Sequence, residues 1–129
     1  MEYYFSTIIK GDFDTIISKI TEALRNEGFG IITTIDIQSA LKEKIGVDFR
    51  KYQILGACNP TFAHKALQVE EKIGVMLPCN VVVIDKENGT TEVAAVHPMA
   101  SMMAIQNPAL GPLAEEITEK LRRVIENLN

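Results

Sequence analysis

The chain has 129 residues and a formal net charge of −4; 47% of its residues are hydrophobic and 23% are charged. A folded domain of this mass exposes about 6,800 Å² of the roughly 20,700 Å² of its extended chain, so its core needs neither disulfide nor metal. The composition excludes a disordered chain, a collagen and a disulfide-rich toxin. The acidic balance argues against general nucleic-acid binding, because surfaces that grip nucleic acid are basic. We expect one domain over residues 1–129.

The first third of the chain alternates between strand and helix patterns. Residues 3–10 are rich in aromatic and β-branched side chains, which predicts a strand. Asp12 suits the N-cap of a helix whose apolar residues recur every three or four positions, and Gly28 suits its end. Residues 31–35 form a β-branched run that is typical of a second strand.

A second helix and a third strand follow. Either Asp36 or Ser39 can cap a helix that runs through Lys44, and Gly46 can end it. Residues 52–57 predict the third strand.

The third helix begins at Asn59-Pro60, because Asn is a good cap and the first helical position needs no N–H group. Residues 81–85 and 91–96 flank an Asn-Gly pair and predict a β-hairpin. Residues 98–105 predict a short helical turn.

Regularly spaced apolar residues predict a C-terminal helix; they are Leu113, Ile117, Leu121, Val124, Ile125 and Leu128. The element order is therefore β-α-β-α-β-α-β-β-(α)-α. The hairpin requires at least one antiparallel pair, so we expect an α+β fold rather than a purely parallel sheet.

Charged residues are absent from three segments, 52–63, 73–84 and 93–114, which together hold 46 residues, both cysteines and all five prolines. Charged side chains avoid full burial unless they are paired. These segments therefore should form core, pocket wall or subunit interface. The longest one is not a membrane span, since it contains His97 and its three prolines interrupt a helix.

Two short Cys-Asn matches stand out in these segments: Cys58-Asn59-Pro60 ends a predicted strand, and Pro78-Cys79-Asn80 opens another. If the two strands pair antiparallel, the end of the first meets the start of the second. Both pairs would then converge at one edge of the sheet.

Each thiol has two interpretations. Cys58 precedes a helix N-terminus, which favours a thiolate, so Cys58 or Cys79 is a candidate for thiol chemistry. The structural interpretation is that both are small buried apolar residues, and without a nearby base we favour it. The start of the chain lacks the pattern of a signal peptide, so we expect a cytoplasmic protein with free thiols.

The remaining polar candidates are Asn59, Asn80, His64 and His97. Asn59 is adequately explained as a cap, whereas Asn80 heads an apolar strand and either satisfies backbone groups there or faces a ligand. The spacing of the cysteines and histidines matches no standard zinc pattern, so we expect no metal site. Phosphate-binding glycine loops and serine-nucleophile motifs are also absent from the sequence.

The same segments resemble the domain-of-unknown-function 302 family, most specifically at Gly56-Ala57-Cys58-Asn59-Pro60 and Leu77-Pro78-Cys79-Asn80. The resemblance covers nearly the whole chain. It implies helices packed on a curved, mainly antiparallel sheet, similar to the TATA-binding-protein-like architecture. It also implies a homodimer, and it brings no settled activity or cofactor.

Three functions remain open. The first is a cytosolic, homodimeric module that binds a small molecule through Cys58, Asn59, Pro60, His64, Cys79, Asn80 and His97. The second is a thiol-dependent enzyme or redox protein that uses Cys58 or Cys79. The third is a structural or interaction domain without a ligand. We rank the binding module first because the sequence shows no acid-base pair, and we expect neither nucleic acid nor membrane as a partner.

Overall fold

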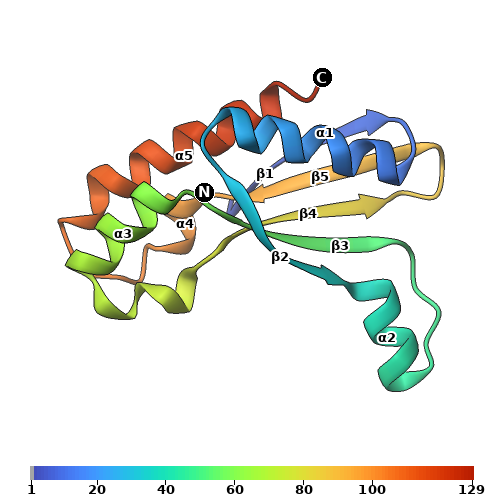
Figure 1. The fold of residues 1–129 in the computed structure, drawn as a ribbon, viewed down its shortest axis with the longest axis horizontal. Helices are drawn as coiled ribbons and strands as arrows, with labels where there is room; N and C mark the ends of the chain where they lie inside the picture. Colours follow the sequence, from blue (N-terminus) through green and yellow to red (C-terminus); the bar gives the residue numbers. More distant parts are fainter. Residues whose placement is uncertain (1) are drawn as a thin grey trace.

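Five antiparallel strands form one sheet in the order β1-β5-β4-β3-β2, and helices pack on it (Figure 1). The computed structural model describes residues 2–129. Its elements are β1 (Tyr4–Lys10), α1 (Phe13–Asn26), β2 (Gly30–Asp36), α2 (Ile37–Ile45), β3 (Tyr52–Cys58), α3 (Pro60–Val69), the 3-10 helix η1 (Glu71–Met76), β4 (Cys79–Asp85), β5 (Thr90–Val96), α4 (Pro98–Ser101) and α5 (Leu110–Glu126).

The predicted α+β fold and the predicted element order are confirmed, and all four strand pairings are antiparallel. The one element that the sequence did not indicate is η1. This 3-10 helix has six residues and a period of three residues, so it is too short to show an amphipathic repeat. Only Ile73 of η1 is buried, so the sequence has no apolar stripe that would predict this helix.

Local signals set the helix boundaries. The side chain of Asp12 accepts a hydrogen bond from the Thr15 N–H at 2.9 Å, which caps α1. Of the two candidates for the second cap, Asp36 takes the role, because it accepts from the Ser39 N–H at 3.0 Å. Gly46 ends α2 with a left-handed backbone, φ 68°.

The core lies between the sheet and two long helices, α1 and α5, which lie over the same face. Its fully buried side chains come from both layers and include Ile16, Ile20, Leu24, Leu55, Val81, Val83, Val93, Ile117, Leu121 and Val124. Helices α3 and α4 pack against α5. The charge-free segments thus supply much of the core, although Val75 and Met103 in these segments are exposed.

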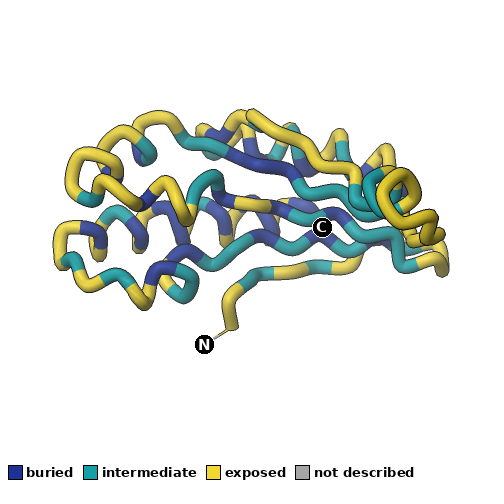
Figure 2. The backbone as a smooth tube through the Cα atoms, turned by 90° about the horizontal axis from the view of Figure 1, so that it is seen from below, coloured by how far each residue is buried: buried dark blue, intermediate teal, exposed yellow. Residues whose placement is uncertain are grey.

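The opposite face of the sheet, which we call the open face, is not covered by α1 or α5. Side chains alternate along a strand, so the neighbours of the buried core residues point to this face. Its central side chains are apolar and half-buried: Tyr52, Ile54, Val82, Ile84, Ala94 and Val96. Figure 2 views the molecule from below, where the three central strands, β3, β4 and β5, are mainly intermediate or buried and the edge strand β2 is mainly exposed.

Candidate functional site

The two Cys-Asn segments meet in the β3–β4 ladder. Ala57 pairs with Cys79, and Gly56 pairs with Asn80, because the strands run antiparallel. Adjacent residues of a strand point to opposite faces. Within each Cys-Asn pair, the two side chains therefore lie on opposite faces of the sheet. The four polar groups do not gather at one site.

Cys79 belongs to the core side. It is 4% exposed, and burial raises the pKa of its thiol to about 12. A thiol with that pKa is protonated at neutral pH and is neither a nucleophile nor a metal ligand in this state. Asn59 also serves the helix side, since its side chain accepts a hydrogen bond from the Phe62 N–H at 3.1 Å and caps α3.

Cys58 and Asn80 belong to the open side. Asn80 is exposed, and the strand alternation places the half-buried Cys58 on the same face as Gly56 and Asn80. Both cysteines are free thiols.

Gly56 is covered by its neighbours on the open face. A Cβ at this position would meet the Thr33 hydroxyl and would lie 2.8 Å from Cγ of Pro78. The peptide bond before Pro78 is cis. The glycine and proline of the two segments thus fit against each other, which gives these residues a packing role.

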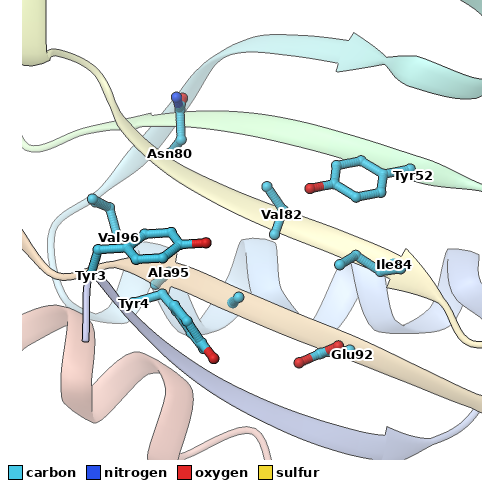
Figure 3. Close-up of a pocket in the computed structure, with 10 residues that line it drawn as sticks. Tyr3, Tyr4, Tyr52, Asn80, Val82, Ile84, Glu92, Ala95 and Val96 are labelled. Atoms are coloured by element: carbon cyan, nitrogen blue, oxygen red, sulfur yellow. The ribbon is translucent and has the colours of Figure 1, made fainter. Parts of the chain in front are cut away.

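A pocket with a volume of about 380 Å³ occupies the open face beside Asn80 (Figure 3). Its floor consists of uncharged residues from β4 and β5. The lining residues are Tyr3, Tyr4, Tyr52, Asn80, Val82, Ile84, Glu92, Ala94, Ala95 and Val96. This volume lies within the range of small-molecule sites, roughly 300–1,000 Å³.

Polar groups stand at the rim of the pocket. In Figure 3 the rings of Tyr3 and Tyr52 lie on opposite sides, and their hydroxyl groups point inward. Glu92 supplies the one charged group among the described lining residues, and its carboxylate is 3.3 Å from Nζ of Lys86. The nearby Glu2 carboxylate raises the pKa of Tyr4. The rim therefore offers hydroxyls, an amide and negative charge.

The other predicted site residues lie away from this pocket. Pro60 is the first residue of α3, and His64 is exposed on the same helix. His97 follows β5, and its ring stacks on Phe5 with centroids 4.6 Å apart, while Arg122 of α5 lies over the same phenyl ring. The Nδ1 atom of His97 is buried without a hydrogen-bond partner in the part of the chain that the structure describes.

Of the seven predicted site residues, Asn80 alone lines the pocket. Sequence reasoning missed Tyr3, Tyr4, Tyr52 and Glu92. A signal was present, however: residues 81–84 and 93–96 are apolar at every position, whereas a strand with one wet face alternates. That pattern indicates that β4 and β5 carry apolar side chains on both faces of the sheet, including the open face.

Residues 2–129 contain no group of three or more His, Cys, Asp or Glu side chains arranged to hold a metal ion. Within the same residues, every helix is too short or too polar to cross a bilayer.

Comparisons with protein families and with solved structures identify the family to which the chain belongs. The family model for the domain of unknown function DUF302 matches residues 5–128. The chain belongs to the DUF302 family. A crystal structure of an uncharacterised conserved DUF302 protein from Bacillus stearothermophilus superposes with a TM-score of 0.91; the two sequences are 28% identical, and the match covers 100% of both chains. Among proteins of curated function, none matches this chain.

Proposed function

We propose that this DUF302 protein is a homodimeric, cytoplasmic module that binds a small molecule in the pocket on the open face. The observation that carries the proposal is the pocket itself: an uncharged floor, about 380 Å³ of space, and tyrosine hydroxyls and an amide group at the rim. Small-molecule sites combine an apolar wall with a few oriented polar groups in this way.

The charges of the residues at the rim restrict the class of ligand that the pocket can bind. Among the described residues that line the pocket there is no Lys or Arg, and Glu92 carries a negative charge. An anion would lose its hydration there without gaining a cationic partner. We therefore expect a ligand with an apolar body and a neutral or cationic polar end, which tyrosine rings and Glu92 can accept.

Thiol chemistry has less support. The Cys79 thiol, with its pKa raised to about 12, is the wrong ionisation state for a nucleophile at neutral pH. The other candidate, Cys58, is a half-buried free thiol that does not line the pocket. Pocket binding therefore has more direct support from geometry than thiol catalysis.

Three probes of similar size test the proposal: benzylamine, benzyl alcohol and benzoate, titrated into the full chain and followed by two-dimensional amide NMR. We expect shifts centred on Tyr52, Asn80 and Val82, and binding of the amine or the alcohol at least about tenfold tighter than binding of benzoate, a difference of about 1.4 kcal/mol. Equal or tighter binding of benzoate would overturn the assigned ligand class.

A filled pocket provides the matched control. The substitution Ala94→Leu adds bulk to the pocket floor, whereas Ala104→Leu makes the same change at an exposed site outside it. The first variant should lose binding and the second should keep it. Shifts from none of the probes in a folded protein would count against small-molecule binding and favour an interaction domain.

A further inference from the structure

All three tyrosines of the chain line the pocket on the open face. The chain also has five phenylalanines, and none of them is among the described lining residues. Tyr4 and Tyr52 are half-buried, so they form part of the pocket wall. A tyrosine attracts a cation through the negative face of its ring, and its hydroxyl oxygen accepts hydrogen bonds. The pocket is therefore rich in groups that favour a positive charge.

Strand register brings Glu92 to the same end of the pocket as Tyr52. Tyr52 of β3 pairs with Ile84 of β4, and Ile84 pairs with Glu92 of β5, so the three residues form one row across the open face. Figure 3 shows Ile84 between the other two side chains. Neighbouring strands lie about 4.8 Å apart, which puts the backbones of Tyr52 and Glu92 roughly 10 Å from each other. This row forms a polar end of the pocket.

The next row along the strands is apolar. Val82 pairs with Ala94, and both line the pocket. Two residues further along β5, Val96 pairs with Tyr4 of β1. A strand rises about 3.3 Å per residue, so Val96 lies roughly 13 Å from Glu92. The pocket therefore has space for a compact apolar group beside its charged end.

Glu92 is a charged residue in an apolar setting. Strands β3 and β5, all of whose residues are described, carry no other charged side chain. The side chain of Glu92 is only 22% exposed, and a carboxylate that is partly withdrawn from water requires a cationic partner. The pKa of Tyr4 is raised by the Glu2 carboxylate and, to a smaller extent, by Glu92, so the charge of Glu92 is felt at a second tyrosine of the pocket.

Lys86 satisfies Glu92 only in part. Its Nζ atom lies 3.3 Å from Oε1 of Glu92, whereas hydrogen bonds between such charged groups are usually about 2.7–2.9 Å long. The two oxygens of a carboxylate offer about four acceptor positions, and this long contact uses one of them. Lys86 does not line the pocket. A cationic ligand can therefore approach Glu92 from the pocket, in competition with Lys86.

We propose that the pocket selects a small organic ammonium ion, whose apolar body lies on Val82 and Ala94 and whose charged nitrogen lies beside Glu92. This inference rests on the proposed function and decides between the neutral and cationic ligands that the proposed function leaves open. Glu92 determines the specificity, because a neutral ligand of the same shape lacks the attraction and an anion is repelled.

Benzylamine and benzyl alcohol test the charge requirement, because they share a ring and differ mainly in charge at neutral pH. The titrations use amide NMR of the full chain at about 0.15 M ionic strength, where exposed charges are screened beyond roughly 8 Å. Benzylamine should bind at least about fivefold more tightly than benzyl alcohol, with shifts centred on Tyr52, Ile84 and Glu92. Equal affinities would overturn this inference and leave pocket binding intact.

Substitution of Glu92 tests whether the selectivity belongs to that residue. Glu92→Gln keeps the shape of the side chain and removes its charge, so it should lower the affinity for benzylamine to that for benzyl alcohol. Glu115→Gln is the matched control, since it makes the same change of net charge at an exposed site on α5, outside the pocket. Circular dichroism verifies that both variants are folded. Unchanged benzylamine binding in Glu92→Gln, or an equal loss in both variants, would overturn the inference.

Lys86→Gln gives the opposite expectation. It removes the competing cation and keeps Glu92, so benzylamine should bind about two- to fivefold more tightly while benzyl alcohol binds as before. Unchanged or weaker binding of benzylamine would contradict the proposed competition. The proposed function fails separately, if neither benzylamine nor benzyl alcohol nor benzoate binds the wild-type chain.

Discussion

At the scale of single residues, the members of the two Cys-Asn segments serve mainly in packing and capping. Cys79 fills the core, Asn59 caps a helix, and Gly56 admits the Pro78 ring. Asn80 is the member that is exposed and lines the pocket. The sequence left thiol chemistry open for these segments but favoured a structural role, and most of their members have such a role in the structure.

The close approach at Gly56 makes a direct prediction. In Gly56→Ala the new methyl group meets Thr33 and Pro78, and overpacking of this kind costs about 1–3 kcal/mol of the free energy of unfolding. Urea denaturation measures the loss.

The control for that measurement is Gly30→Ala, since nothing lies within 4 Å of a Cβ at Gly30. The double variant Gly56→Ala with Thr33→Ala should recover part of the loss, because it removes one of the two colliding groups. A Gly56→Ala protein as stable as the wild type would refute the packing role.

At the scale of elements, helices begin and end where short-range signals say they should. Asp12, Asp36 and Asn59 each accept a hydrogen bond from an N–H three residues ahead. Capping acts within one turn and needs no tertiary contact, which is why these starts are legible in the sequence.

The cap of α3 can be tested by itself. Asn59→Ala removes the acceptor of the Phe62 N–H and should lower the free energy of unfolding by about 1 kcal/mol. Asn59→Asp keeps an acceptor at the same place and should retain most of the stability. If the two variants lose equal stability, the side-chain oxygen is not what stabilises the start of α3.

At the scale of the whole molecule, α1 and α5 come from opposite ends of the chain and are joined across the top of the core. Arg123 contacts the Glu27 carboxylate through Nε at 3.2 Å and through a terminal nitrogen at 2.8 Å. The Glu27 side chain is 17% exposed, and the bond from Arg123 lowers the pKa of its carboxyl group. The ion pair therefore ties together parts that local sequence cannot connect.

The pH dependence of this contact follows from that lowered pKa. The ion pair stabilises the folded protein fully at pH values above 4.5, the ordinary pKa of a glutamate. This stabilisation is lost as the pH falls through the lower pKa that Glu27 has in the folded protein. Arg123→Gln should therefore lower Tm at pH 7, and the difference from wild type should shrink toward about pH 3.

Thermal unfolding at several pH values follows the trend, with Arg25→Gln as the control. Its partner is Glu22, and both side chains are more than 60% exposed. A surface pair of this kind contributes little, so the control should match the wild type at every pH. A constant Tm difference for Arg123→Gln down to low pH would contradict the role of Glu27.

The sequence by itself determined the order of elements, most of their boundaries, the α+β class and the family. Caps, glycine stops and apolar spacing act over a few residues, so they can be read without knowing the fold. The charge-free segments also indicated where core and pocket wall would lie.

Only the tertiary structure decided which side chains share a site. Tyr3, Tyr52, Asn80 and Glu92 come from separate parts of the chain and meet on one face because of how the strands pair. Shifting a strand by one residue would exchange its two faces, and the apolar–polar alternation that usually specifies the inward face is missing from residues 81–84 and 93–96. The strand pairing therefore places the Cys79 side chain in the core and the Asn80 side chain on the open face, although the two residues are neighbours in the sequence.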